Sequence, residues 1–341
     1  MPQGCLAESS GEYRIEMSSQ RYMPAFHFLW ERTSGKDVGV VGMGCKLCPR
    51  ECNVTRTKED MGYCKEGSVL RVARAALHAW EEPCICKGAG SGTVFFSGCP
   101  LQCVFCQNGS IAGANAAAPF GKEISKERLT EIFFELQKKG ACNINLVTPT
   151  HFVPQIIPAL RDARKNGLSI PVVYNTGGYE KPETIRALDG LVDIYLPDLK
   201  YVSSRLSARY SNAPDYFSWA SASIAEMFRQ TGTFAYDPET SLLTKGVIVR
   251  HMMLPRHLAD SERVLDYLFS TYENRILYSI MSQYTPVRFF DDMPELNRRV
   301  SHKEYNALIQ YSLALGIENG FFQEGEAAVE SFIPAFDGEG V

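Results

Sequence analysis

From residue 93 onward, short apolar stretches alternate with amphipathic ones. Stretches rich in β-branched or aromatic residues, such as 93–98 and 171–178, are typical of buried strands. Segment 125–140, SKERLTEIFFELQKKG, predicts a helix that begins after Ser125 and ends at Gly140. Further strands are expected at 143–150, 193–200, 246–255 and 276–284, and further helices at 154–167, 181–190, 216–232 and 261–273.

This order of elements predicts an α/β fold. About six strand-then-helix units favour a parallel sheet covered by helices. An open doubly wound sheet and a partial or full barrel both remain compatible with the pattern. In either architecture, functional side chains gather where the strands end.

The rest of the chain suggests four regions. Residues 1–44 are expected to form an N-terminal arm with a short helix around residues 24–32. Residues 45–92 are punctuated by cysteine and glycine with little periodicity, and small modules of this kind often depend on a metal. The strand–helix units occupy residues 93–300, and a capped helix with a tail follows at 301–341.

Composition restricts the class of protein. The chain has 341 residues, of which 45% are hydrophobic, and this is ordinary for a globular protein with a sizeable core. A net charge of −4 gives no sign of a nucleic-acid or membrane-surface partner. No secretory signal and no apolar run long enough to span a membrane are seen, so we expect a cytoplasmic protein.

The cysteines indicate metal chemistry. There are eleven, and all but one precede residue 107. Tight spacings such as C-x2-C in a long intracellular chain favour metal or redox sites over disulfides. Cys84 and Cys86, a C-x-C pair without partners, are expected to be free, with a role as additional metal ligands as the alternative. Cys5 and Cys142 are expected to be structural.

Three cysteines follow the first predicted strand in a C-x3-C-x2-C arrangement, namely Cys99, Cys103 and Cys106. A structural zinc site normally takes four protein ligands, and no histidine lies nearby in the sequence. A 4Fe–4S cluster held by three thiolates keeps one iron open for another ligand. The triplet therefore favours a catalytic cluster.

This motif, with Phe105 before its last cysteine and CQN at 106–108, resembles the radical S-adenosylmethionine (radical SAM) superfamily. The strings VTPTHFVPQI, VYNTGGYE, DIYLPDLKY and RHMMLP resemble its pyruvate formate-lyase-activating-enzyme-like branch. The resemblance runs from about residue 45 to about residue 286. It implies a partial (β/α)6 barrel of parallel strands with an N-terminal cysteine-rich metal-binding module.

The resemblance also implies a reaction. S-adenosylmethionine would bind the open iron, and one electron from the cluster would cleave its sulfonium to methionine and a 5′-deoxyadenosyl radical. That radical would abstract hydrogen from a substrate, and an activating enzyme installs a glycyl radical in a partner enzyme. An electron donor such as flavodoxin or ferredoxin is implied as well.

The resemblance assigns candidate residues to the strand ends. Related enzymes carry a Gly-Gly-Glu motif after the second strand, where this chain has Thr148 and Thr150, followed by His151, which is either a site residue or a core histidine. Candidate cofactor-binding residues are Phe105, Asn108, Thr148, Thr150, Asn175, Thr176, Asp198, Lys200 and Gln283, and catalytic candidates are His151, Arg250, His251 and Tyr284.

Two of these assignments have alternatives. Asp198 and Lys200 match a DxK pattern that meets the carboxylate of S-adenosylmethionine, and a mutual salt bridge is the other reading. Tyr284 stands near the place where related enzymes carry a histidine, so that contact differs here.

A second cysteine set comprises Cys45, Cys48, Cys52 and Cys64. Four thiolates in twenty residues suit either a closed zinc site or a fully ligated second iron–sulfur cluster, and spacing does not separate the two.

The sequence thus predicts a radical SAM enzyme, with a glycyl-radical enzyme as one target of its radical. Modification of a small molecule, peptide or RNA is the alternative within the enzymes. A non-catalytic iron–sulfur electron carrier or metal-binding protein is the alternative from another class. That alternative does not account for the polar residues at the strand ends.

Overall fold

The computed structural model describes residues 44–113, 120–322, 334 and 336–341. The helix expected around residues 24–32 and Cys5 lie outside the described residues. The architecture below belongs to the compact unit formed within residues 40–341.

The centre of the fold is a parallel sheet. Its neighbouring strands follow one another in chain order, and each pairs in parallel with the next. These strands are β2 (Ser91–Phe96), β4 (Ile144–Val147), β5 (Val172–Thr176), β6 (Ile194–Pro197), β8 (Leu243–Met252), β9 (Leu277–Met281) and β10 (Gly320–Phe322).

The strand order decides between the two predicted architectures. A doubly wound sheet reverses its strand order at a switch point, and this sheet has no reversal. Right-handed crossovers that always move in one direction leave their helices on one face, as in a barrel. The outer strands β10 and β3 (Lys122–Ile124) do not pair with each other in the described residues, so the barrel is partial.

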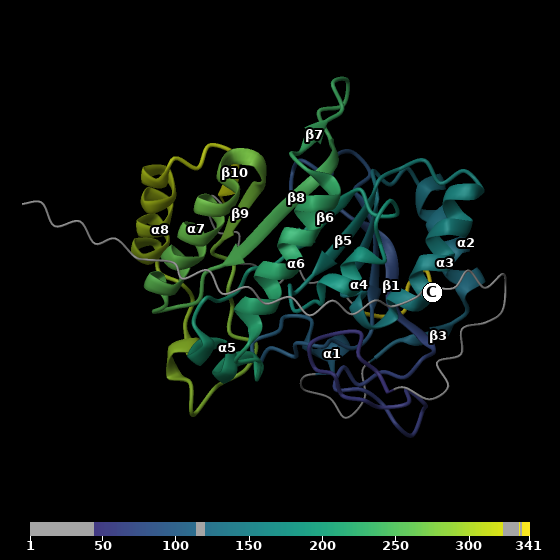
Figure 1. The fold of residues 1–341 in the computed structure, drawn as a ribbon, viewed down its shortest axis with the longest axis horizontal. Coiled ribbons are helices and arrows are strands. Elements are labelled where there is room, and N and C mark those ends of the chain that lie inside the picture. The colour runs from purple at the N-terminus through teal and green to yellow at the C-terminus, as the bar shows by residue number, and fades with distance from the viewer. Residues whose placement is uncertain (1–43, 114–119, 323–333, 335) are drawn as a thin grey trace, which may run out of the picture. The chain divides into compact units, whose positions relative to one another are not determined.

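Helices cover the outside of this sheet. Ser125 accepts a hydrogen bond from the backbone of Arg128 and caps α2, as its sequence predicts. Figure 1 shows α6 and α4 in front of the central strands. Helices α7 and α8 lie beside β9 at the left of the view, and α2 and α3 lie together at the right. The main helices are α2 (Lys126–Lys138), α3 (Val153–Lys165), α4 (Pro182–Arg186), α5 (Ser204–Ser211), α6 (Tyr216–Thr231), α7 (Leu258–Tyr272) and α8 (His302–Leu315).

One long strand was not expected. β1 (Leu70–His78) lies within the cysteine-rich stretch and pairs antiparallel with both β2 and β3. The end of the chain continues this edge, because the backbone N–H of Ala75 donates to the carbonyl of Glu339 at 2.9 Å. Arg74 also forms an ion pair with Asp337 at 3.0 Å. Short elements complete the description: β7 (Ala235–Tyr236), α1 (Gly109–Ala112) and single 3-10 turns at Thr150–Phe152, Glu273–Arg275 and Pro294–Asn297.

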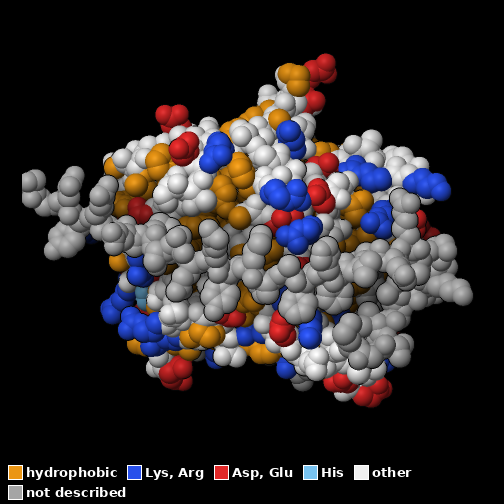
Figure 2. Space-filling model, viewed as in Figure 1, with side chains coloured by type: hydrophobic (Ala, Val, Ile, Leu, Met, Phe, Trp, Pro, Cys, Tyr) orange, Lys and Arg blue, Asp and Glu red, His pale blue; other side chains and the backbone are white. Residues whose placement is uncertain are grey.

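The described part of one face of the molecule shows no large patch of a single charge. On the face in Figure 2, basic and acidic side chains are interspersed over the part that is described, in keeping with the modest net charge of −4. Among the described helices, none combines the length and apolar character that crossing a membrane requires.

Candidate active site

The loop after β2 carries the cysteine triplet and needs a glycine at its start. Gly98 has φ of +79°, which favours glycine. A Cβ at this position would lie 2.5 Å from the carbonyl oxygen of Cys64, so the two chain segments approach too closely for a side chain. The Cys99 N–H donates to that same carbonyl at 3.2 Å. Gly98 therefore permits the contact that holds the loop.

The three thiols of the loop line one cavity of about 220 Å³. Cys103 is buried, while Cys99 and Cys106 are half-buried. The Ser211 hydroxyl donates to Cys103 Sγ at 3.2 Å, and the Leu101 N–H donates to Cys99 Sγ at 3.4 Å. Burial, followed by the neighbouring thiols, raises the pKa of Cys106 to about 12.

These thiols fit a 4Fe–4S cluster. A coordinating thiol is deprotonated by its metal, so bound iron would offset the burial that keeps these thiols protonated. Hydrogen bonds to the sulfur atoms, like those on Cys99 and Cys103, are among the features that set a cluster's potential. No three His, Cys, Asp or Glu side chains in the described ranges converge as ligands of a single ion. A cubane does not require such convergence, because each thiolate binds its own iron.

A charge network closes the opposite wall of the cavity. Asp198, after β6, accepts from Lys200 Nζ at 2.5 Å and from Arg250 Nε at 2.8 Å. Arg250, on β8, also donates to the side-chain oxygen of Asn175 at 2.7 Å. Although burial opposes ionisation, Arg250 and then Lys200 hold the pKa of Asp198 below its usual range. The structure thus joins four predicted residues from three strand ends.

The residues after β4 and β5 divide between the cavity and the core. Thr148 lines the cavity with φ of +56°, a strained conformation for a β-branched residue and one that clusters at functional sites. Asn175 and Thr176 line it too. Thr150 instead donates to Oε1 of the buried Glu180 at 2.5 Å, and Thr176 donates to the same oxygen. Burial raises the pKa of Glu180 to about 7.

Neither predicted histidine lines the cavity. His151 Nε2 lies 2.6 Å from the carbonyl oxygen of Ser97, and burial lowers the pKa of this histidine to about 3. His251 uses both ring nitrogens, since Nδ1 lies 2.7 Å from the Leu199 carbonyl and Nε2 lies 2.9 Å from the Ser261 hydroxyl. Both side chains support the backbone of strand-end loops.

Phe105 and Tyr284 lie together beneath the loop. Phe105 packs edge-on against Tyr284 with ring centroids 6.0 Å apart, and it also lines the cavity. The Tyr284 hydroxyl donates to the Leu296 carbonyl at 2.7 Å, away from the cavity. Gln283 lines the cavity, and its backbone carbonyl accepts from Gln107 at 3.2 Å. Asn108 lines it as well.

The second cysteine set packs directly on the loop after β2, which carries Cys99, Cys103 and Cys106. Cys48 and Cys64 are buried, and Cys45 and Cys52 are half-buried. A Cβ on Gly62 would lie 3.1 Å from Cys64 Sγ and 3.3 Å from Cys52 Sγ, so these two sulfurs flank one glycine. Burial raises the pKa of Cys48 to about 12 and that of Cys64 to about 11. Cys52 and Cys64 therefore lie on either side of Gly62, and the charges of the Cys45 and Cys64 thiols also reach Cys48.

Arg50 joins the two cysteine sets. Its guanidinium donates to the Pro100 carbonyl at 2.8 Å and to the Ser211 carbonyl at 2.8 Å, and it lies 4.0 Å from the ring centre of Tyr63. The carbonyl of Tyr63 accepts from the Gln102 side chain at 2.5 Å. Residues between Cys48 and Cys64 therefore contact the loop that carries the cysteine triplet.

Sequence reasoning missed several cavity residues. Met252 ends β8 and Met281 ends β9, so their strand-end positions were the available signal. Gln107 lies between two predicted residues of the CQN string. Leu101, Val147 and Gly177 also line the cavity. The ten described cysteines form no disulfide with one another.

The cavity lies at the carboxyl ends of β2, β4, β5, β6, β8 and β9, which defines a strand-end site in a partial parallel barrel. The family model of the radical SAM superfamily matches residues 93–258, the stretch that carries the triplet and the first five of those strand ends. The match spans 166 of the 341 residues, just under half of the chain. Similarity to this superfamily points to a 4Fe–4S cluster, S-adenosylmethionine and radical chemistry.

Individual proteins give a broader comparison. An uncharacterized protein of Methanocaldococcus jannaschii is 28% identical over 277 residues, which cover 78% of this chain and 73% of that protein. SuiB of Streptococcus suis, solved with S-adenosylmethionine, shares 14% identity at a TM-score of 0.43 over 67% of this chain and 46% of SuiB. Methylornithine synthase (PylB) shares 12% identity at a TM-score of 0.45 over 72% of this chain and 67% of PylB.

Proposed function

We propose that the chain is a radical SAM enzyme whose Cys99, Cys103 and Cys106 hold a 4Fe–4S cluster. One observation carries this proposal: the three thiols line the same cavity as Asn175, Asp198 and Lys200, which belong to other strand ends. When bound and reduced, the cluster would supply the electron that cleaves S-adenosylmethionine to methionine and a 5′-deoxyadenosyl radical.

The chain's own residues would bind and orient S-adenosylmethionine. Lys200 lies at the cavity with its charge shared by Asp198, and it suits the carboxylate of the methionyl group. The strained Thr148 and the adjacent Asn175 offer oxygen atoms to an amino group. Met252, Met281 and Leu101 supply apolar surface that excludes water from the reacting atoms.

The test is anaerobic reconstitution followed by measurement of 5′-deoxyadenosine after reduction with S-adenosylmethionine. Replacing Cys99, Cys103 and Cys106 by alanine is expected to abolish 5′-deoxyadenosine formation and to remove about four irons per chain. Cys142→Ala, which changes a half-buried cysteine of another segment, serves as the control. A fully loaded wild-type protein that forms no 5′-deoxyadenosine would refute the proposal.

The target of the radical is a separate question. The resemblance to activating enzymes supports a glycyl-radical enzyme as partner, and a glycyl-radical signal formed in such an enzyme during co-incubation would establish that role. The cavity next to the cluster loop favours the second candidate, modification of a small molecule. Flavodoxin or ferredoxin is the proposed electron donor, in the cytoplasm, where the free thiols described above would stay reduced.

A further inference from the structure

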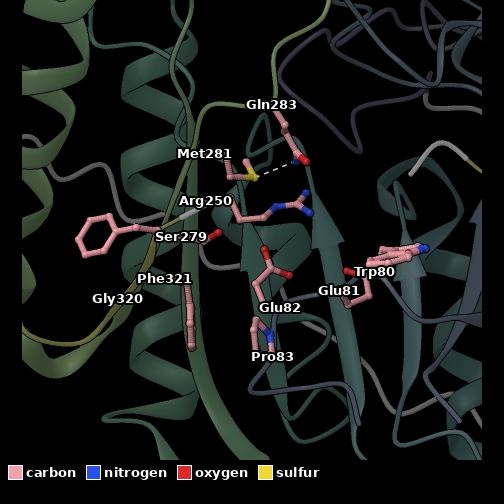
Figure 3. A pocket seen from close by; sticks show the side chains of 11 residues that line it. Trp80, Glu81, Glu82, Pro83, Arg250, Ser279, Met281, Gln283, Gly320 and Phe321 are labelled. Atoms are coloured by element: carbon pink, nitrogen blue, oxygen red, sulfur yellow. Dashed lines mark hydrogen bonds between the residues drawn. The ribbon is translucent and has the colours of Figure 1, made fainter. Parts of the chain in front are cut away.

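A larger cavity of about 450 Å³ adjoins the one that contains the cysteines. The two share Arg250, Met281 and Gln283, so they meet at the ends of β8 and β9. Figure 3 shows the side chains that line the larger cavity. It is lined by Trp80, Glu81, Glu82, Pro83, Arg250, Ser279, Met281, Gln283, Gly320, Phe321 and Phe322.

Two neighbouring carboxylates mark one side of this cavity. Glu81 and Glu82 follow β1, and Figure 3 shows the Glu82 carboxylate directed toward Arg250. The Glu82 residue is 9% exposed. Glu81 is half-buried and interacts with the Asn145 side chain. Neither glutamate is within ion-pair distance of a cation in the described residues, whereas buried carboxylates such as Glu82 are normally paired.

The nearby arginine attracts both glutamates, but its charge is shared with another carboxylate. Arg250 already donates hydrogen bonds to Asp198 and Asn175, and Asp198 also accepts one from Lys200. Three carboxylates therefore face two cations across the adjoining cavities. Burial, followed by the charge of Glu82, raises the pKa of Glu81 to about 8. A bound cation would relieve this repulsion.

A second observation also points to a ligand. Ser279 is 5% exposed, and its hydroxyl makes no hydrogen bond to any described residue. Figure 3 shows this hydroxyl directed into the cavity near Arg250. Because this hydroxyl faces the cavity and has no partner among the described residues, it is available to a bound molecule.

The other walls suit the apolar part of a small ligand. Phe321 and Met281 line the side of β9 and β10, and Trp80 is exposed at the rim. An indole face attracts a cationic nitrogen as well as packing against apolar groups. The volume equals that of about fifteen liquid waters, which limits the ligand to a small molecule or one side chain.

We propose that this cavity is the substrate site and that the substrate carries a cationic nitrogen, an ammonium or guanidinium group, held by Glu81 and Glu82. Ser279 accepts a further hydrogen bond from the same group, and the apolar part of the substrate lies against Trp80 and Phe321. The assignment of this ligand as a substrate rests on the proposed function, whereas the binding site itself does not.

Calorimetry on the reconstituted, unreduced protein with S-adenosylmethionine tests the site. The cationic probes are tyramine, 2-phenylethylamine and butylguanidine, and their neutral counterparts are N-acetyltyramine, 2-phenylethanol and butylurea. We expect at least one cationic probe to bind at least about tenfold more tightly than its neutral counterpart, because a hydrogen bond to a charged group favours binding by that factor or more.

The variant E81Q/E82Q is expected to bind the preferred probe with an affinity at least about tenfold lower than that of the wild type. Glu239→Gln, an exposed position outside the cavity, is the matched control and should bind like the wild type. If thermal unfolding shows that E81Q/E82Q is not folded, Ser279→Ala replaces it, with an expected loss of about threefold or more for the same probe.

Equal binding of the cationic and neutral probes would overturn the inference, and so would unchanged binding to a folded E81Q/E82Q. The 5′-deoxyadenosine assay is run separately. Because the binding measurement involves no reduction, a protein that forms no 5′-deoxyadenosine counts against the proposed function, while the calorimetry still decides the cationic site.

Discussion

Asp198 contacts two cations at once, and this pairing determines how its neighbours respond to substitution. Lys200 lies 2.5 Å from one carboxylate oxygen of Asp198, and Arg250 lies 2.8 Å from the other. Removing Asp198 would leave two uncompensated buried charges, which costs several kcal/mol. Removing Lys200 leaves the Asp198–Arg250 pair intact, so Lys200 is the residue whose binding role can be tested separately from stability.

Lys200→Met is therefore expected to weaken S-adenosylmethionine binding. The loss of one charge-assisted hydrogen bond corresponds to an affinity about ten- to hundredfold lower. Calorimetric titration of the reconstituted protein measures the effect. Lys303→Met, an exposed position on α8, should bind S-adenosylmethionine normally. Equal affinity in the wild type and Lys200→Met would show that Lys200 serves only its salt bridge with Asp198.

Glu180 predicts a pH dependence of stability. Its pKa is raised by burial to about 7, against about 4.3 in an unfolded chain. The folded state therefore binds the extra proton between these values, so the contribution of this group is fully present below pH 4 and is lost as pH rises through 7. Gln does not titrate, so the free energy of unfolding of Glu180→Gln should not show this loss. Relative to the wild type, it should rise by about 1–3 kcal/mol between pH 5 and pH 8.

Urea unfolding at the two pH values measures that difference. Glu183→Gln, an exposed position on α4, should show no comparable change. A pH-independent difference between the wild type and Glu180→Gln would mean that Glu180 is ionised in the folded protein despite its burial.

Single residues also show where sequence reasoning reached its limit. Asn175, Asp198 and Arg250 were predicted at separate strand ends, and the structure joins them because parallel strands end at one edge of the sheet. His151 and His251 end strands as well, but their rings turn to backbone carbonyls. Strand-end position is readable from the sequence, whereas the side to which a ring turns depends on tertiary packing.

At the scale of elements, periodicity predicted most helices and every parallel strand of the described residues except β10, which lies in the expected tail. β2, β4, β5, β6, β8 and β9 alternate with helices, as the apolar pattern indicates. β1 was missed because its sequence, LRVARAALH, does not alternate strictly between apolar and polar residues and is rich in alanine and arginine, which favour helices. Its antiparallel pairing with β2 is a long-range choice that local patterns do not specify.

The loop after β2 yields a prediction about its glycine. Gly98→Ala would place a methyl group 2.5 Å from the Cys64 carbonyl in a left-handed backbone conformation. Gly167→Ala has a similar positive φ but meets nothing within 4 Å, so it isolates the conformational cost of about 1 kcal/mol. Gly98→Ala should lower the free energy of unfolding by at least about 1 kcal/mol more than this control.

Denaturant unfolding and iron content check both variants. The iron content should fall in Gly98→Ala because the Cys99 N–H loses its contact with the Cys64 carbonyl, whereas Gly167→Ala should retain its iron. Equal stability and equal iron in the two variants would contradict the close approach of the two segments.

At the scale of the whole molecule, the described part of the chain brings two cysteine sets together. The Cys99 N–H donates to the Cys64 carbonyl, and Arg50 bridges the same two segments through the Pro100 carbonyl. If both sets hold iron–sulfur clusters, an electron can pass from the second set to the cluster at the active site without a separate docking step. A structural zinc at the second set would stabilise the loop but carry no electron.

Iron counting separates these two roles of the second set. With Cys48→Ala and Cys64→Ala combined, we expect the iron content of the reconstituted protein to fall from about eight to about four per chain, because each 4Fe–4S cluster contributes four. The spectroscopic signal of the cluster at Cys99, Cys103 and Cys106 should persist. Cys84→Ala, which changes a buried cysteine of neither set, is the control and should keep its iron. Unchanged iron accompanied by loss of one zinc would assign the second set to zinc instead, because the thiolates of a closed zinc site bind no iron.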